Sequence, residues 1–270
     1  MARPRIMALI CRRGPTVSER NKCQKLRRVV SVLACAGVVM SLLTATGRAQ
    51  FTSDLAAVAQ NPIASIYSVP FQNRVLGGIG QKQDIANQLN IQPVVPVNLG
   101  SWNVISRTIL PVTYLPQGVA SSTSVFGIGD INQSLFLSPD RPGPIILGVG
   151  SSFNVPSASS RLLGSGRFSA GPSAVVLTTP RPWVIGLLGR QLWSIGGSNR
   201  RTAVSQALLQ PFVNYNFPTG WYLTSSPIIT ADFKSGDHKW SVPIGGGIGK
   251  IFKVAGQAIN AQLQGFDFVE

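Results

Sequence analysis

The chain has 270 residues, of which 44% are hydrophobic and only 12% charged, and this composition excludes a disordered chain. Its formal net charge of +15 comes mainly from residues 1–49, which hold ten Lys and Arg residues and one acid. A nucleic-acid footprint clusters its cations and interleaves them with aromatic residues. The basic residues after position 49 are instead scattered mostly singly, so we expect no nucleic-acid partner.

Residues 1–49 are typical of a signal peptide with a long basic n-region. The basic stretch ends in Arg27 and Arg28, and an apolar run follows over residues 29–43. Fifteen residues are too few for a membrane-spanning helix, which needs about 20, but they match a secretory h-region. Gly47 and Ala49 supply the small residues of a cleavage site, which predicts export of residues 50–270.

Alternatives to a cleaved leader remain open. The apolar run could act as an amphipathic or signal anchor, Cys35 could be a lipidation site, and translation could start at Met7 or later. All three cysteines (Cys11, Cys23 and Cys35) lie in this leader. The exported chain therefore has no thiol for a disulfide or a metal site.

The exported part reads as one domain of β-strands. Residues 53–60 and 81–88 are expected to form short helices or irregular arms. Period-two alternation of apolar and polar residues, closed by Gly, Pro, Ser, Asn or Asp, predicts eleven strands. Their expected ranges are 64–76, 89–99, 102–114, 128–137, 144–155, 167–179, 181–194, 203–216, 220–232, 238–249 and 259–263.

Aromatic placement favours a membrane barrel over a soluble sandwich. Trp183 and Trp193 share a face of their strand, and Trp102 and Tyr114 bracket another strand in the same way. Ten residues at about 3.3 Å each, tilted by about 40°, span about 25 Å, the height of the apolar band of an outer-membrane barrel. We therefore expect these four aromatics at the membrane interfaces of a single antiparallel up-and-down transmembrane β-barrel of about 10–12 strands. A sandwich whose core they fill is the alternative.

Polar and charged residues inside the strands are candidates for the barrel lumen. An Arg facing lipid near the membrane midplane costs roughly 2–4 kcal/mol, so the lumen is the cheaper side. A pore lining that sets solute selectivity and a polar plug that closes the lumen both fit these residues. The candidates, all on the face opposite the apolar stripe, are Arg107, Asp130, Asn132, Arg190, Gln206, Gln210, Lys239 and Gln262.

The sequence offers little for catalysis. His238 is the single histidine, and its neighbours are typical of a solvated loop. The last residue, Glu270, is the one glutamate after the leader. A metal site needs several ligands, so we expect no metal, no cofactor and no enzymatic activity. A Ser–His lipid hydrolase built on His238 is a formal alternative.

Four stretches resemble a known family: 104–112 (VISRTILPV), 126–136 (FGIGDINQSLF), 163–172 (LGSGRFSAGP) and 210–221 (QPFVNYNFPTGW). They are similar to exported bacterial β-barrel proteins related to the meta-pathway phenol-degradation transporter proteins, often labelled transporter or neuromedin U. The resemblance covers about residues 61–264.

The resemblance implies a Gram-negative outer-membrane barrel of about twelve strands, inserted into the lipid bilayer by the barrel-assembly machinery. It implies a narrow passive channel or uptake route for small, by analogy aromatic, molecules. A barrel without transport and a soluble periplasmic binding protein are the alternatives. Such families usually finish in an aromatic residue after a further strand, whereas this chain stops at Glu270. With eleven predicted strands, either one strand is merged or missed in the count, or the last strand is missing.

Overall fold

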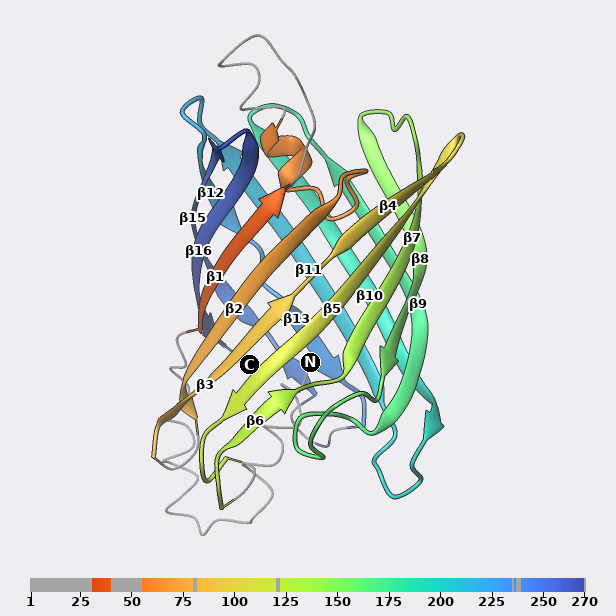
Figure 1. Cartoon of the computed structure of the whole chain (residues 1–270), viewed down its shortest axis with the longest axis vertical. Coiled ribbons are helices and arrows are strands. Elements are labelled where there is room, and N and C mark those ends of the chain that lie inside the picture. Colours follow the sequence, from red (N-terminus) through yellow and green to blue (C-terminus); the bar gives the residue numbers. More distant parts are fainter. Residues whose placement is uncertain are drawn as a thin grey trace.

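The described residues form one antiparallel β-sheet that closes on itself (Figure 1). The computed structural model describes residues 31–39, 55–79, 82–119, 122–234, 236 and 239–269. Most of the predicted leader, the expected loop residue His238 and the final Glu270 lie outside them. Among the described residues, no helix is long and apolar enough to cross a membrane.

Residues 55–59 form a short helix, and the rest of the regular structure is strand. The strand segments are β1 (Ser31–Val39), β2 (Ser68–Ile79), β3 (Asp84–Ile91), β4 (Val94–Leu99), β5 (Trp102–Leu115), β6 (Val125–Ile128), β7 (Ile131–Pro139), β8 (Ile145–Val155), β9 (Arg167–Thr178), β10 (Trp183–Gly197), β11 (Ser205–Asn216), β12 (Trp221–Ser225), β13 (Ile229–Asp232), β14 (Trp240–Ser241), β15 (Pro243–Val254) and β16 (Gln257–Phe268).

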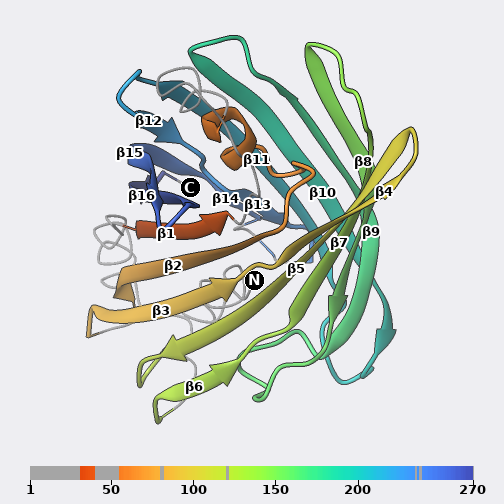
Figure 2. The same ribbon diagram turned by 45° about the horizontal axis from the view of Figure 1, so that its top comes forward.

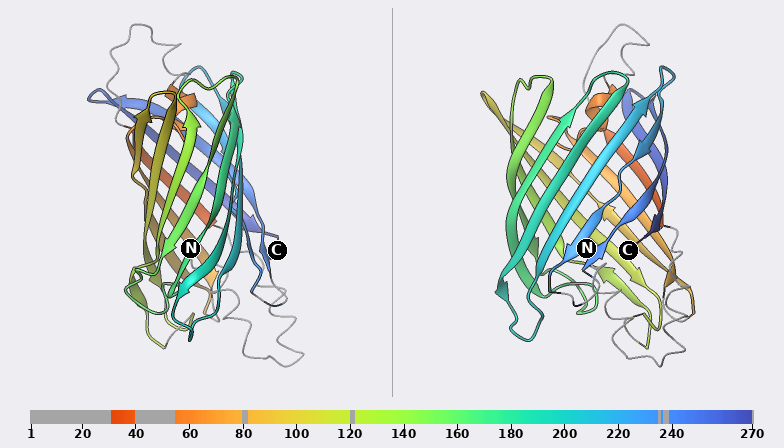
Figure 3. Two further views of the ribbon diagram at one scale, coloured as in Figure 1. Left: turned by 90° about the vertical axis from the view of Figure 1, so that its right-hand side faces the viewer. Right: turned by 180° about the vertical axis from the view of Figure 1, so that it is seen from behind.

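In several places, two neighbouring segments together make one crossing of the barrel wall, with a short interruption between them. We call each crossing of the wall a stave, whether one segment or two segments form it. Both β3 and β4 pair with β5, both β6 and β7 pair with β5, and both β12 and β13 pair with β11. Similarly, β14 pairs with β13 while β15 pairs with β12. The sixteen segments therefore make twelve staves. Pairing of β10 with β11, and of β1 with both β2 and β16, closes the ring (Figure 3). The expected all-β, antiparallel up-and-down barrel is confirmed.

The twelfth stave comes from an unexpected place. Eleven staves lie within residues 68–268, as the alternation predicts, and the remaining one is β1, inside the predicted h-region. Its backbone is antiparallel to both neighbours, with Cys35 opposite Gln72 of β2 and Gln262 of β16. Cleavage before Gln50 and the missing last strand stay predictions.

One local expectation is wrong. Residues 81–88 were expected as a helix or an irregular arm, but β3 begins at Asp84 and pairs with β2 and β5. Its inward positions carry Ala86, Gln88 and Asn90, all buried, and the apolar Ala86 inside together with the polar Asn87 on the outer parity interrupts the alternation. The outward side chain of Ile85 is exposed.

The wall is apolar outside, and its inner side combines buried polar side chains with a buried apolar cluster. In β7 the side chains of Asn132 and Ser134 are 4% and 7% exposed, whereas those of Leu135 and Leu137 are 41% and 39% exposed. A soluble sandwich buries its apolar face instead. This inversion is the pattern of an outer-membrane barrel.

The two ends of the barrel differ in the length of their connections. At the end that is uppermost in Figure 1, the connections at 100–101, 140–144, 179–182, 217–220 and 255–256 have two to five residues; we call it the short-turn end. The 28-residue connection 40–67 between β1 and β2 starts and finishes at this end as well. At the opposite, long-loop end, the connections at 80–83, 116–124, 156–166, 198–204 and 233–239 have four to eleven residues.

Candidate functional site

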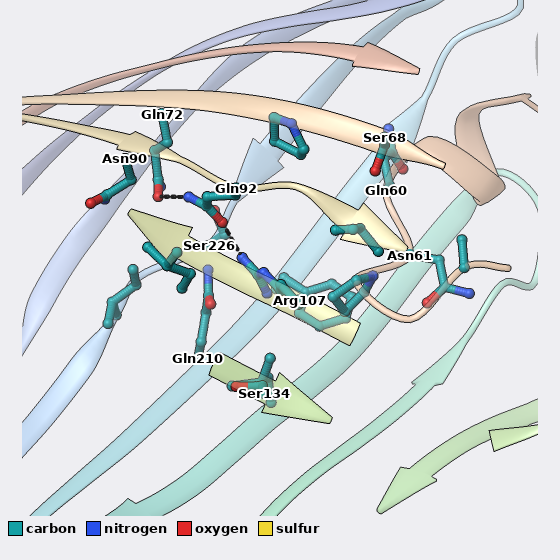
Figure 4. Close-up of a pocket in the computed structure, with 18 of the residues that line it drawn as sticks. Gln60, Asn61, Ser68, Gln72, Asn90, Gln92, Arg107, Ser134, Gln210 and Ser226 are labelled. Carbon is teal, nitrogen blue, oxygen red and sulfur yellow. Dashed lines mark hydrogen bonds between the residues drawn. The ribbon is translucent and has the colours of Figure 1, made fainter. Parts of the chain in front are cut away.

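The barrel encloses a cavity of about 250 Å³ (Figure 4). Its walls come from most of the staves and from the segment that precedes β2. Six of the eight predicted lumen residues line it: Arg107, Asp130, Asn132, Arg190, Gln210 and Gln262. The ring thus brings together side chains that are up to 155 residues apart in sequence.

A chain of side-chain hydrogen bonds crosses one wall of the cavity. Arg107 Nη2 on β5 donates to Gln92 Oε1 at 2.5 Å, and Gln92 Nε2 donates to Gln72 Oε1 on β2 at 2.9 Å (Figure 4). Arg74 Nη2 reaches the same Gln72 oxygen at 3.5 Å. Because the amides accept from the guanidinium groups, they fix the position of positive charge without neutralising it.

The opposite wall carries the third arginine. Arg190 of β10 donates from Nη1 to Asn132 Oδ1 of β7 at 2.6 Å. The charges of Arg107 and Arg74 act on Arg190, so the three guanidinium groups share one electrostatic environment. We call Arg74, Arg107 and Arg190 the arginine cluster.

Arg74 was missed in the sequence analysis although a signal for it exists. It has the same parity as Gln72 in β2, and both are buried, at 4% and 9% exposed. The opposite parity carries Val69 and Phe71, which are exposed. Reading this alternation along residues 69–74 would have assigned Arg74 to the lumen.

Asp130 lines the cavity, but its carboxylate is engaged with a loop. It accepts hydrogen bonds from the backbone N of Ser165 at 2.5 Å and of Ala158 at 3.3 Å, and from Asn154 Nδ2 at 3.3 Å. A Cβ at Gly164 would lie 2.3 Å from Asp130 Oδ1, so a glycine there permits this close approach. The 156–166 loop is thereby held at the long-loop end.

That loop also buries an apolar anchor. The side chain of Leu163 is 3% exposed and joins a cluster at the long-loop end of the barrel with Ile79, Ala86, Leu115 and Val119. The two motifs around Asp130 and Gly164, which are distant in the sequence, therefore meet in one structural unit.

The short-turn end is narrowed by the N-terminal segment, residues 55–67, which lies inside the ring (Figure 2). Ile63 is 2% exposed and packs among inward-facing residues that include Ile105 and Phe212. Gln60 and Asn216 exchange hydrogen bonds, from Gln60 Nε2 to Asn216 Oδ1 at 2.8 Å and from Asn216 Nδ2 to Gln60 Oε1 at 3.2 Å.

Two predicted lumen residues do not line the cavity. Gln206 shares the inward parity of Gln210, but it is the second residue of β11 at the long-loop end, where its Nε2 lies 3.4 Å from Asp232 Oδ2. Lys239 is exposed in the loop before β14, and its carbonyl accepts from the backbone N of Asp232 at 2.7 Å. Lys239 lies outside the wall because β14 begins at Trp240, whereas Gln206 keeps its inward position on β11 but lies beyond the cavity.

The predicted interface aromatics all face outward. Trp102, Tyr114, Trp183 and Trp193 are 41–48% exposed and lie toward the ends of β5 and β10. Their contact with membrane interfaces stays a prediction. Within the ranges that the structure describes, no group of three His, Cys, Asp or Glu residues is placed to hold a metal ion.

Comparisons with known proteins include a similarity to a solved structure. No protein-family model matches the chain, and no curated protein matches it. The crystal structure of an outer membrane channel from Pseudomonas putida F1 is similar over 89% of this chain and 95% of that chain, with a TM-score of 0.47 and 11% sequence identity.

Proposed function

We propose that this protein is an outer-membrane barrel that forms a narrow passive channel for small molecules. The observation that supports the proposal is the closed ring with exposed apolar side chains outside and a cavity lined by buried polar side chains inside. In a hydrocarbon environment all backbone groups must be paired within the protein, and a closed barrel meets this condition. As proposed, the protein is not an enzyme.

The cavity limits the size of the solute. A volume of about 250 Å³ lies just below the roughly 300–1,000 Å³ of sites for drug-sized ligands, which favours smaller solutes. The apolar part of the lining includes Ile109, Phe136 and Phe212, which supports the aromatic solutes that the motif resemblance implies.

The location follows from the same proposal. Bacterial outer-membrane barrels have short periplasmic turns and longer extracellular loops, so the short-turn end would face the periplasm. Export directed by residues 1–49 and insertion by the barrel-assembly machinery of a Gram-negative cell complete the proposal. Because β1 (Ser31–Val39) belongs to the closed ring, the proposed barrel keeps this segment and is not cleaved before Gln50.

A second candidate is a barrel without transport that has a structural role in the envelope. It is favoured by the N-terminal segment, which narrows the short-turn end, and by the 156–166 loop held on Asp130 at the other end. In this case the polar side chains of the lumen would serve only to hold the closed barrel together.

Conductance separates the two candidates. The full chain, extracted from membranes and shown to be folded by heat-modifiable gel mobility, is added to a planar bilayer in KCl. We expect discrete current steps, with heat-denatured protein as the control. A folded, inserted barrel without steps would contradict the channel and favour the structural role, and extraction from membranes by buffer alone would contradict the barrel itself.

A further inference from the structure

The cavity carries an excess of positive charge. Among the described residues that line it, the charged ones are Arg74, Arg107, Arg190 and Asp130. The carboxylate of Asp130 is directed to the 156–166 loop, where it accepts from two backbone N–H groups. The arginine cluster therefore dominates the field in the cavity.

Neutral amides are among the partners that orient the arginine cluster. Arg107 and Arg74 donate to amide oxygens of Gln92 and Gln72, and Arg190 donates to that of Asn132. Hydrogen bonds to amides orient a guanidinium and leave its full charge in the enclosed space, where electrostatic interactions are stronger than in water. An anion that enters gains from all three charges at once.

The long-loop end adds a second, independent charge asymmetry. Its connections carry six basic residues against one acid, Asp237, which is outside the described residues. The short-turn connections carry two basic residues and one acid. We call the six the basic rim: Lys82, Arg161, Arg200, Arg201, Lys234 and Lys239. A mouth with an excess of one sign of charge concentrates ions of the opposite sign.

The lining next to the arginine cluster is apolar on one side. Ile109 and Pro111 follow Arg107 along β5, and Leu188 precedes Arg190 on β10; all three line the cavity. A solute that carries an anionic group and a short apolar portion matches both parts of this surface. Guanidinium groups suit a carboxylate because they can bind it through two parallel hydrogen bonds.

We propose that the arginine cluster is a binding site for small organic anions, monocarboxylates in particular, and makes the barrel anion-selective. The proposal rests on the proposed channel for its transport aspect, whereas binding of the anion does not depend on conductance. The basic rim concentrates the anion at the long-loop end, and the arginine cluster then replaces part of its hydration shell inside.

The first test is ion selectivity. With the full chain in a planar bilayer under a KCl gradient, we expect a reversal potential whose sign shows preference for Cl⁻ over K⁺. The double variant Arg107→Gln/Arg190→Gln should lower the permeability ratio about tenfold, the low end of the effect of focused charge. The control Arg141→Gln removes one exposed charge at the short-turn end and should leave the ratio unchanged.

The variant Arg107→Lys/Arg190→Lys distinguishes the effect of lost charge from the effect of a disturbed fold. It keeps the positive charge and should therefore keep the anion preference. Every variant is first checked for heat-modifiable gel mobility. A folded channel that prefers K⁺, or whose selectivity the glutamine variant does not change, would overturn the proposal.

The second test is binding, and it distinguishes failure of this proposal from failure of the channel. Isothermal titration of the folded, detergent-solubilised full chain should show saturable binding of butyrate, weaker binding of the neutral butyramide, and loss of butyrate binding in the glutamine variant. Butyrate binding without conductance would retain the anion site and reject the channel. Conductance without butyrate binding or anion preference would reject the anion site alone.

Discussion

Asp130 shows how one buried side chain can set the shape of a barrel end. Its carboxylate accepts two backbone N–H groups of the 156–166 loop and the amide of Asn154, and it is 5% exposed. Removing it leaves these buried donors without their acceptor, at a cost of about 1–3 kcal/mol for each unsatisfied group. The loop then keeps its apolar anchor, Leu163, and the hydrogen bonds of Ser157 and Ser159 with the backbone of residues 128–131.

We therefore expect Asp130→Ala to release the 156–166 loop. In the folded barrel, trypsin should cleave after Arg161, an exposed loop residue, at least about tenfold faster than in the unmodified protein, since 1.4 kcal/mol of lost local stability is a factor of ten in opening. The matched control is Asp140→Ala, which removes a carboxylate bonded to Asn98 and Asn103 at the short-turn end. Equal cleavage of both variants would show that Asp130 does not hold the loop.

At the scale of the strand, an even or odd number of staves decides whether a fully antiparallel ring can close. From β2 to β16 there are eleven staves in alternating directions, so β2 and β16 run the same way. Direct contact between them would require a parallel pair in an otherwise antiparallel wall. One antiparallel strand between them removes this conflict, and β1 takes that place with nine residues in register on both sides.

The chain of residues 50–270 alone should therefore fail to close. In detergent it would leave two strand edges unpaired, each unsatisfied backbone group costing several kcal/mol in hydrocarbon. We expect it to lack the compact, heat-modifiable form that the full chain shows on gels. Recovery of that form by residues 50–270 alone would contradict the need for β1.

A graft provides the rescue experiment. Because Ser31 lies opposite Phe266, near the end of β16, Ser31–Val39 can be appended after Val269 through a short turn and enter the same position. We expect this graft to restore the compact form, and a version with Ala34→Pro and Ala36→Pro to fail, since proline cannot donate to a central ladder.

The strand scale also shows what the sequence predicts well and where it stops. β5 is bounded by Trp102 and Leu115, within one residue of its predicted end, because its apolar outer face is long and closed by turn residues. The 84–88 part of β3 was missed because Ala86 is an apolar residue on the inner face and Asn87 a polar residue on the outer face, which interrupts the alternation. The six predicted cavity residues could be identified because alternate residues of a strand face the same side of the sheet. The contact of Asp130 with the 156–166 loop could not be predicted, because it joins segments that only the tertiary fold brings together.

For the whole molecule, the environment of the outer surface is the property on which the function depends. Leu187 of β10 is 40% exposed and lies between Trp183 and Trp193, which bracket the expected apolar band. Ile195 of the same strand is 68% exposed and lies beyond Trp193. If lipid surrounds the barrel, these two outward positions differ in depth, whereas in water they would be equivalent.

We expect Leu187→Arg to lower the free energy of unfolding in phospholipid vesicles by about 2–4 kcal/mol, and Ile195→Arg by about 0–1 kcal/mol, because the cost of an arginine falls from the bilayer midplane to the interface. Denaturant titration of the two variants measures the difference. A soluble all-β protein would tolerate both substitutions within about 0.5 kcal/mol, as is usual for surface positions. Equal, small effects at the two sites would therefore remove the membrane barrel, and with it the channel and its selectivity.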